Sequence, residues 1–165
     1  MHKKYMDIAI ECSNKSKGGP FGAVIVDENK NIIAKVSNSV TIDNDPTAHA
    51  EVNAIRMACK KKKNFKLENC ILYSSCEPCP MCLSACYWAG VKEIYYANTR
   101  KDAADINFDD NFIYDEIIKE PSDRTIKMEK MENVEAIKTF NIWKYSTSKI
   151  EYWFYLYILD IWIAL

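Results

Sequence analysis

Apolar positions follow two periods along the chain. Helical spacing, as at Tyr5, Ala9 and Cys12, predicts a helix over residues 2–16 that Gly18-Gly19-Pro20 ends. The same spacing predicts further helices over 48–62, from Pro78 or Pro80 to about Trp88, over 111–119 and over 133–145. Short apolar runs bounded by polar turns predict strands over 22–27, 32–36, 71–74, 93–97 and 125–131, with a polar loop over 38–45.

The alternation of strands and helices predicts an α/β layer structure. No Pro/Gly-rich linker divides the chain, so we expect one domain over residues 1–152 and an apolar tail over 153–165. The thirteen tail residues carry one charge, Asp160, and are too few to span a bilayer, which needs about 20. The tail can pack on a subunit surface, rest on a membrane or be an unnatural extension, and the sequence leaves these alternatives open.

Charge and cysteine content narrow the class of protein. The 22 basic and 23 acidic residues give a net charge of −1, which offers no general attraction to nucleic acid or acidic membranes. The first ten residues have no long apolar stretch, so we expect no secretory signal. Seven cysteines in such a chain indicate a reducing compartment, and we therefore expect a cytoplasmic protein. In such a compartment cysteines serve more often as ligands, nucleophiles or core residues than in disulfides.

Two short motifs carry the chemistry. His49-Ala50-Glu51 is followed further along by Pro78-Cys79-Pro80-Met81-Cys82. The pair H-x-E and P-C-x-x-C is the signature of zinc deaminases that act on bases. A catalytic zinc takes three protein ligands and leaves a fourth position for water, and His49, Cys79 and Cys82 supply three. We therefore predict one zinc per chain, a zinc-bound hydroxide as attacking group, and Glu51 as the proton shuttle.

Two other classes of site use some of the same cysteines. Cys76, Cys79, Cys82 and Cys86 have the C-x2-C-x2-C-x3-C spacing of a bacterial iron–sulfur run, which makes an electron carrier a remote alternative. Against it, Tyr87 stands where that pattern has proline, and no second run exists. A purely structural zinc site usually has four protein ligands, so Cys76 or Cys86 would have to serve as the fourth.

The sequence resembles the bacterial guanine deaminases of the cytidine-deaminase superfamily from about Tyr5 to Tyr152. Three stretches carry the resemblance but are also similar to tRNA adenosine deaminases: 19–26 (GPFGAVIV), 44–52 (NDPTAHAEV) and 73–82 (YSSCEPCPMC). The guanine branch is indicated more selectively by Asp102-Ala103-Ala104, by residues 108–114 (FDDNFIY) and by Trp88.

The resemblance implies a fold, an assembly and a substrate site. It implies a three-layer α/β/α sandwich with a five-stranded mixed sheet, and a homodimer in which C-terminal segments can be exchanged. By position, Phe21 would lie against a purine, Asn38 would hydrogen-bond it, Trp88 would help wall the pocket, Asp110 would accept from guanine N–H groups and Tyr152 would close over the ring.

The leading interpretation is hydrolytic deamination of guanine, a small-molecule purine, to xanthine and ammonia. A carboxylate such as Asp110 can pair with guanine N1–H, which adenine lacks, and a site built on that bond rejects analogues without it. The alternatives are deamination of adenosine in tRNA, which the near-neutral charge disfavours, or of another purine, a pyrimidine base or a nucleoside. We expect no nucleic-acid partner.

Overall fold

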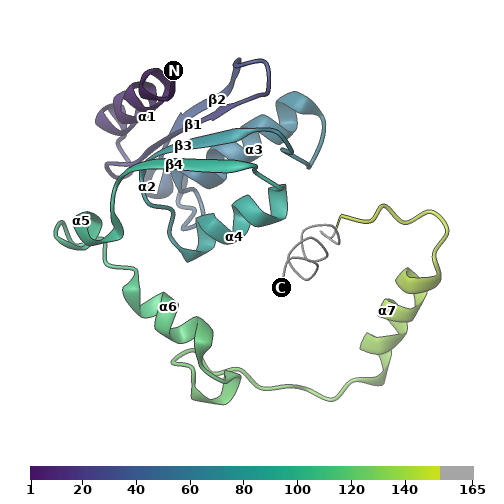
Figure 1. The fold of residues 1–165 in the computed structure, drawn as a ribbon. Helices are drawn as coiled ribbons and strands as arrows, with labels where there is room; N and C mark the ends of the chain where they lie inside the picture. Colours follow the sequence, from purple (N-terminus) through teal and green to yellow (C-terminus); the bar gives the residue numbers. More distant parts are fainter. Residues whose placement is uncertain (153–165) are drawn as a thin grey trace, which may run out of the picture. The chain divides into compact units, whose positions relative to one another are not determined.

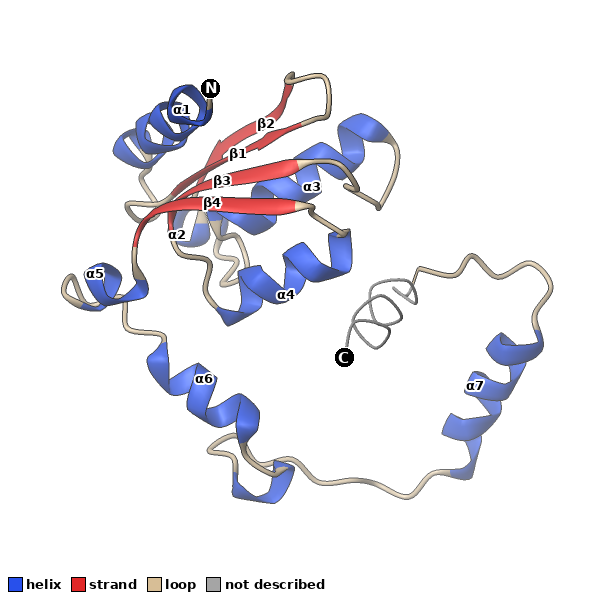
Figure 2. Cartoon of the chain, in the orientation of Figure 1, coloured by secondary structure: helices blue, strands red, loops and turns tan. Residues whose placement is uncertain are grey.

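The computed structural model describes residues 1–152, so the predictions about the tail 153–165 fall outside the described residues. These residues form two units, one from Met1 to Tyr114 and one that begins at Asp115. Figure 2 shows their helices and strands. In chain order they are α1 (His2–Lys15), β1 (Gly22–Val26), β2 (Ile32–Ser37), α2 (Val40–Asp43), α3 (Ala50–Lys62), β3 (Ile71–Cys76), α4 (Pro80–Ala89), β4 (Glu93–Asn98), α5 (Arg100–Ala104), α6 (Asn111–Ile118), the 3-10 helix η1 (Pro121–Asp123) and α7 (Val134–Tyr145).

The first unit is built on a mixed sheet with the strand order β2-β1-β3-β4. β1 runs antiparallel to both β2 and β3, whereas β3 and β4 are parallel and are joined through α4. Because parallel strands share a direction, the carboxyl ends of β3 and β4 lie at the same edge of the sheet. That edge is where α/β proteins place their ligands.

Helices cover both faces of this sheet, as the predicted three-layer arrangement requires (Figure 1). On one face, Tyr5 and Ala9 of α1 pack with Val24, Val26 and Tyr73 of the strands. On the other, α3 and α4 pack against the alternate residues of the same strands. β1 is buried at all five positions, as expected for an inner strand covered on both faces.

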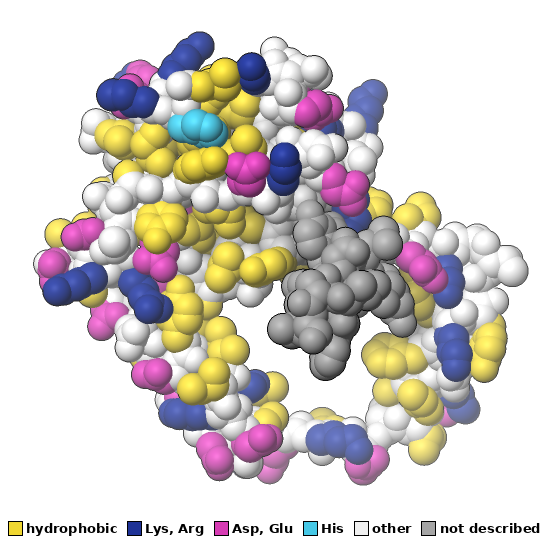
Figure 3. Space-filling view, viewed as in Figure 1, with side chains coloured by type: hydrophobic (Ala, Val, Ile, Leu, Met, Phe, Trp, Pro, Cys, Tyr) yellow, Lys and Arg dark blue, Asp and Glu magenta, His cyan; other side chains and the backbone are white. Residues whose placement is uncertain are grey.

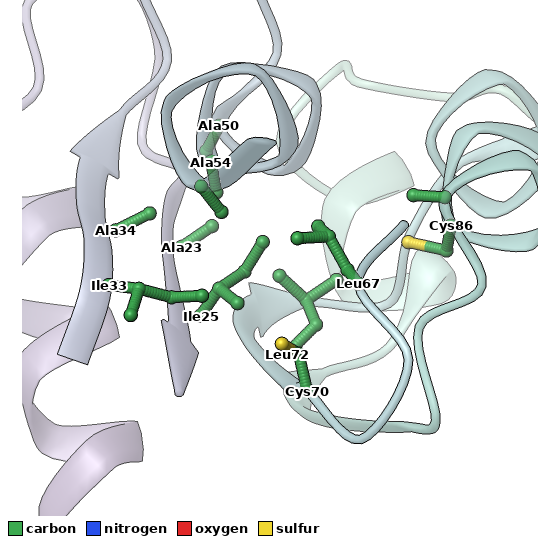
Figure 4. Close-up of a cluster of buried hydrophobic side chains, with 12 residues drawn as sticks. Ala23, Ile25, Ile33, Ala34, Ala50, Ala54, Leu67, Cys70, Leu72 and Cys86 are labelled. Atoms are coloured by element: carbon green, nitrogen blue, oxygen red, sulfur yellow. The ribbon is translucent and has the colours of Figure 1, made fainter. Parts of the chain in front are cut away.

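Small residues bring α3 close to the sheet. Ala50, Ala54 and Ala58 recur every four residues on its buried face. Figure 4 shows Ala50 and Ala54 lying over Ala23 and Ala34 of the neighbouring strands. With methyl groups on both sides of the interface, the helix backbone approaches the strands closely, and its N-terminus is held at the ligand edge of the sheet.

The prediction of five strands is wrong, because the described residues contain four. Residues 125–131, expected as a strand, pair with no other strand in the described chain, and Ile126, Met128 and Met131 are exposed. Alternating apolar residues indicate what a strand would bury, but a strand forms only where another strand offers hydrogen-bond partners.

Two short helices were not predicted. The expected polar loop 38–45 contains the single helical turn α2. α5 begins with a capping box, in which the Thr99 side chain accepts from the Asp102 N–H and the Asp102 carboxylate accepts from the Thr99 N–H. The Thr-x-x-Asp spacing of that box was visible in the sequence. Among the described residues, no helix is both long and apolar enough to cross a membrane.

The second unit holds η1 and α7, and the boundary between the units falls within α6. The Asn133 side chain caps α7 by accepting from the Glu135 N–H. The apolar residues Val134, Ile137 and Ile142 of this helix are all exposed within the described chain. A helical period shows which residues share a face, but not what covers that face.

Gly22 lies at a close contact between α1 and β1. A Cβ at this position would lie 2.3 Å from the Ala9 carbonyl oxygen and 2.4 Å from the Ser13 nitrogen, both of them backbone atoms. Neither neighbour can move without shifting the helix. The absence of a side chain here therefore lets α1 rest directly on β1.

We predict that Gly22→Ala lowers the free energy of unfolding by about 1–3 kcal/mol, the usual cost of overpacking a well-packed interior. Urea unfolding of the purified chain measures this loss. Lys4→Ala on the exposed side of α1 is the matched control and should stay within about 0.5 kcal/mol of the parent. An unchanged stability in Gly22→Ala would contradict the close packing of α1 against β1.

Candidate active site

The N-termini of α3 and α4 converge and bring both sequence motifs together. His49 is the N-cap of α3, with an extended backbone, and Glu51 follows in the first helical turn. Cys79 is the N-cap of α4, where its sulfur accepts from the Cys82 N–H. Pro80 opens that helix at a position where its missing N–H costs nothing. Each motif is therefore ordered by a helix start.

Three donor atoms form one compact group. The Nδ1 atom of His49 lies 3.5 Å from the Sγ atom of Cys79 and 3.5 Å from that of Cys82, and all three ligand atoms lie within 4.8 Å of one another. Zinc bonds of about 2.3 Å to sulfur and about 2.0–2.1 Å to nitrogen, at a tetrahedral angle, separate N and S by about 3.5 Å. The donor set fits a zinc ion with one open position.

Two neighbouring cysteines stay outside this group. Among the described residues, the metal-competent cluster consists of His49, Cys79 and Cys82 and includes neither Cys76 nor Cys86. The Cys76 thiol donates instead to the Thr99 carbonyl oxygen at 3.5 Å. Burial raises the pKa of Cys76 to about 11 and that of Cys86 to about 12, which keeps both protonated. The arrangement favours neither a four-cysteine cluster nor a four-ligand structural zinc.

The Cys79 and Cys82 thiols shift each other's pKa in opposite directions. The Cys82 side chain and then the His49 ring lower the pKa of Cys79, whose sulfur also accepts from the Cys82 backbone N–H at 3.5 Å. The contact with Cys79, burial and the nearby Glu51 raise the pKa of Cys82, whose thiol donates to Oε2 of Glu51 at 3.4 Å. The hydrogen bond with Cys79 also raises the pKa of His49. At a helix N-terminus the backbone N–H groups further favour a thiolate, which is the form that binds a metal.

Glu51 is a buried carboxylate beside these ligands, with 5% of its surface exposed. Burial raises its pKa, because an uncharged carboxyl is easier to bury than a charged one. Its Oε1 accepts a 2.8 Å hydrogen bond from the Ser74 hydroxyl, and its Oε2 lies 3.4 Å from the Cys82 sulfur. A group whose pKa is raised in this way is suited to take up and release a proton.

A pocket of about 450 Å³ opens onto this cluster. Its lining includes the ligands His49 and Cys79 and the carboxylate Glu51. Three residues expected at a substrate, Phe21, Asn38 and Asp110, line the same pocket.

Asn38 is held in one orientation within that pocket. It is 6% exposed, and its side-chain oxygen accepts from the Val40 N–H at 3.0 Å. Its backbone N–H donates to the Phe21 carbonyl oxygen at 3.0 Å, which ties the two pocket residues together. With the oxygen occupied, the side-chain NH₂ group is the donor that Asn38 can offer a ligand.

Asp110 contributes a half-buried carboxylate just before α6. Burial and then the nearby Cys79 raise its pKa, so the site disfavours its negative charge when no ligand is bound. A hydrogen-bond donor on a ligand would relieve that cost.

The pocket lining does not test the other two expected site residues. Trp88 is 50% exposed, does not line the pocket, and stands nine residues after Cys79, about 13 Å further along α4 at 1.5 Å per residue. Tyr152 belongs to the second unit and is 55% exposed. Their expected contacts with a substrate stay predictions.

The structure adds site residues that the sequence reasoning did not select. Ser74 donates to Glu51, and its signal was a polar residue on the strand face that also carries Leu72. Phe108 packs edge-on against Phe21 with ring centroids 5.0 Å apart, and both line the pocket. Glu77 also lines the pocket and accepts from the backbone N–H of Arg100 at 3.1 Å.

Comparison with known proteins agrees with this site. Residues 1–98 match the family model of the cytidine and deoxycytidylate deaminase zinc-binding region. A guanine deaminase of Bacillus subtilis (strain 168) is 51% identical over 150 residues, which make up 91% of this chain and 96% of that protein. An X-ray structure of guanine deaminase from Bacillus subtilis superposes with a TM-score of 0.89 at 48% identity, covering 93% of this chain and 99% of that one.

A more distant relative is similar to this chain over a shorter stretch. A tRNA-specific adenosine deaminase of Haemophilus influenzae is 38% identical over 97 residues, which cover 57% of this chain and 56% of that protein. The similarity to the Bacillus subtilis enzyme, by contrast, extends over nearly the whole of both chains. The chain belongs to the zinc-dependent cytidine and deoxycytidylate deaminase family, and within it is similar over almost its full length to guanine deaminase.

Proposed function

We propose that this chain hydrolyses guanine to xanthine and ammonia. The main support is a single pocket at which the possible zinc ligands His49, Cys79 and Cys82 lie. The same pocket is lined by the buried Glu51 and by Asp110 and Asn38. The similarity to a guanine deaminase over most of the chain supports the same substrate. Cytosolic purine catabolism is the setting that this reaction suggests, and the seven free thiols suit a reducing cytoplasm.

One zinc per chain would be held by His49, Cys79 and Cys82. When bound, zinc lowers the pKa of water at its open position to near neutrality. Glu51 would take one proton from the attacking water and pass it to the adjacent ring nitrogen while the C–O bond forms. It would then move the second proton, from the added hydroxyl, to the amine, so that the C–N bond breaks and ammonia leaves. The burial of Glu51 keeps bulk water from competing for this proton.

Recognition of the base falls to groups away from the metal. In the proposed complex, Asp110 accepts from N–H groups of guanine and the side-chain NH₂ of Asn38 donates to a ring acceptor. Phe21, braced by Phe108, lies against the purine plane. Trp88 as a wall and Tyr152 as a lid remain part of the proposal.

We also propose a homodimer that exchanges C-terminal segments. Figure 3 shows hydrophobic side chains at the surface of the segment that contains α7. Val134, Phe140 and Ile142 are each more than two-thirds exposed within the described chain, at 76%, 73% and 74%. Apolar surface of this kind marks an interface more often than a solvated helix, and a second copy of the chain is the partner we propose.

The rival function is deamination of adenosine in tRNA, which the Haemophilus influenzae relative catalyses by its name. A tRNA enzyme needs a basic surface for the phosphate backbone, whereas this chain has a net charge of −1.

A substrate panel tests the proposal. The purified, zinc-loaded protein is incubated with guanine, adenine, cytosine, their nucleosides and a tRNA that carries a target adenosine, and ammonia release is measured. Guanine should have the highest kcat/KM of the set, because Asp110 pairs with an N–H that adenine lacks. Turnover of the tRNA without turnover of guanine would contradict the assignment.

We predict that Asp110→Ala lowers kcat/KM for guanine by at least about tenfold, because loss of a hydrogen bond to a charged group costs roughly 1.5–3 kcal/mol. Zinc content and thermal stability should stay near the parent values. Asp105→Ala, an exposed acid outside the pocket, is the matched control and should leave kcat/KM unchanged. Parental kcat/KM in Asp110→Ala would remove this residue from base recognition.

A further inference from the structure

Ser74 is a polar residue buried in the middle of an apolar layer. It lies on β3 with 1% of its surface exposed, between Ala23 of β1 and Tyr96 of β4 in the strand register. Side chains alternate along a strand, so Ser74 shares with Leu72 the face that α3 and α4 cover. A hydroxyl buried there without a hydrogen bond would destabilise the fold.

The hydroxyl of Ser74 has a defined donor direction. It donates to Oε1 of Glu51 at 2.8 Å, and the backbone N–H of Cys76 approaches its oxygen at 3.5 Å. A carboxylate can only accept, so the hydroxyl proton points to Glu51. Both partners are buried, which makes this a strong contact in a medium of low dielectric constant.

This contact distinguishes the two oxygens of Glu51. Oε1 is occupied by Ser74, while Oε2 lies on the side of the ligand Cys82, 3.4 Å from its sulfur. The last torsion of a glutamate side chain is broad and roughly two-fold, so the backbone alone does not fix the carboxylate plane. Ser74 restrains Oε1, while the Cys82 sulfur contacts Oε2.

We propose that Ser74 is a positioning residue that holds the Glu51 carboxylate so that Oε2 is the oxygen that moves the proton. The proposal rests on the proposed deamination, in which Glu51 carries that proton. A displacement of about 1 Å at a reacting group can cost about a hundredfold in rate, so a single restraint of this kind matters for turnover.

Variants of Ser74 should change kcat and leave binding of the base intact. We expect Ser74→Ala to lower kcat for guanine about ten- to hundredfold, with KM within about threefold of the parent. Ser74→Thr keeps the hydroxyl and should hold kcat to within about fivefold of the parent, whereas Ser74→Val, which has the shape of threonine without the hydroxyl, should not. The Thr and Val variants have the same shape, so their comparison stands even if Ser74→Ala unfolds.

Ser75 offers a matched control on the same strand. It is also buried, at 3% exposure, and its hydroxyl accepts from the Gly22 N–H at 3.0 Å on the other side of the strand from Glu51. Ser75→Ala should lower the thermal midpoint about as much as Ser74→Ala does, yet keep kcat within about threefold of the parent. Zinc content should match the parent in both variants.

A double-mutant cycle with Glu51→Gln decides whether Ser74 acts through Glu51. Glu51→Gln alone should lose about 10²–10⁴-fold in kcat, and adding Ser74→Ala should then change kcat by less than about twofold. Additive losses, or a parental kcat in both Ser74→Ala and Ser74→Val, would overturn the proposal. If the parent is inactive on guanine but active on another amino-heterocycle, the proposed substrate is wrong, and the Ser74 comparison is still measured on that compound.

Discussion

Three donor atoms from two helices have to reach one tetrahedral ion, and this requirement determines how α3 and α4 pack. The 3.5 Å spacing between the His49 nitrogen and each of the two thiols exists because both helices start at the same edge of the sheet. Alanines on the inner face of α3 allow the close approach, and the carboxyl end of β3 leads into Cys79. The sheet is thus the support on which ligands distant in the sequence come within bonding range.

The site also contains a buried carboxylate, Glu51, and its burial disfavours the charged form. A carboxylate removed from water is destabilised, and its raised pKa reflects that cost. The Ser74 hydroxyl offsets part of it and fixes one oxygen. The same burial shields this carboxylate from solvent, next to a pocket that Asn38 and Asp110 also line. In the proposed reaction Glu51 carries the proton and the other two residues contact the base.

Local chemistry made much of this architecture predictable. His49, Cys79 and Cys82 could be selected because metal ligation constrains spacing along the chain, and Glu51 because it completes the H-x-E motif. Every strand of the first unit followed from its apolar run. The prediction of a fifth strand at residues 125–131 was wrong because a strand needs a pairing partner, and the periodicity of apolar residues does not show whether one exists. Ser74 was missed because its role arises from a contact across 23 residues of sequence, and the distance of Trp88 from the pocket depends on its place along α4.

The proposed chemistry depends on a three-ligand zinc site with one open position. X-ray absorption at the zinc edge of the purified chain, combined with metal analysis, measures the ligands of that site. We predict one zinc per chain, with two sulfur neighbours at about 2.3 Å and two nitrogen or oxygen neighbours at about 2.0–2.1 Å, from His49 and a water. Three or four sulfur neighbours, or iron with inorganic sulfide in place of zinc, would contradict the account.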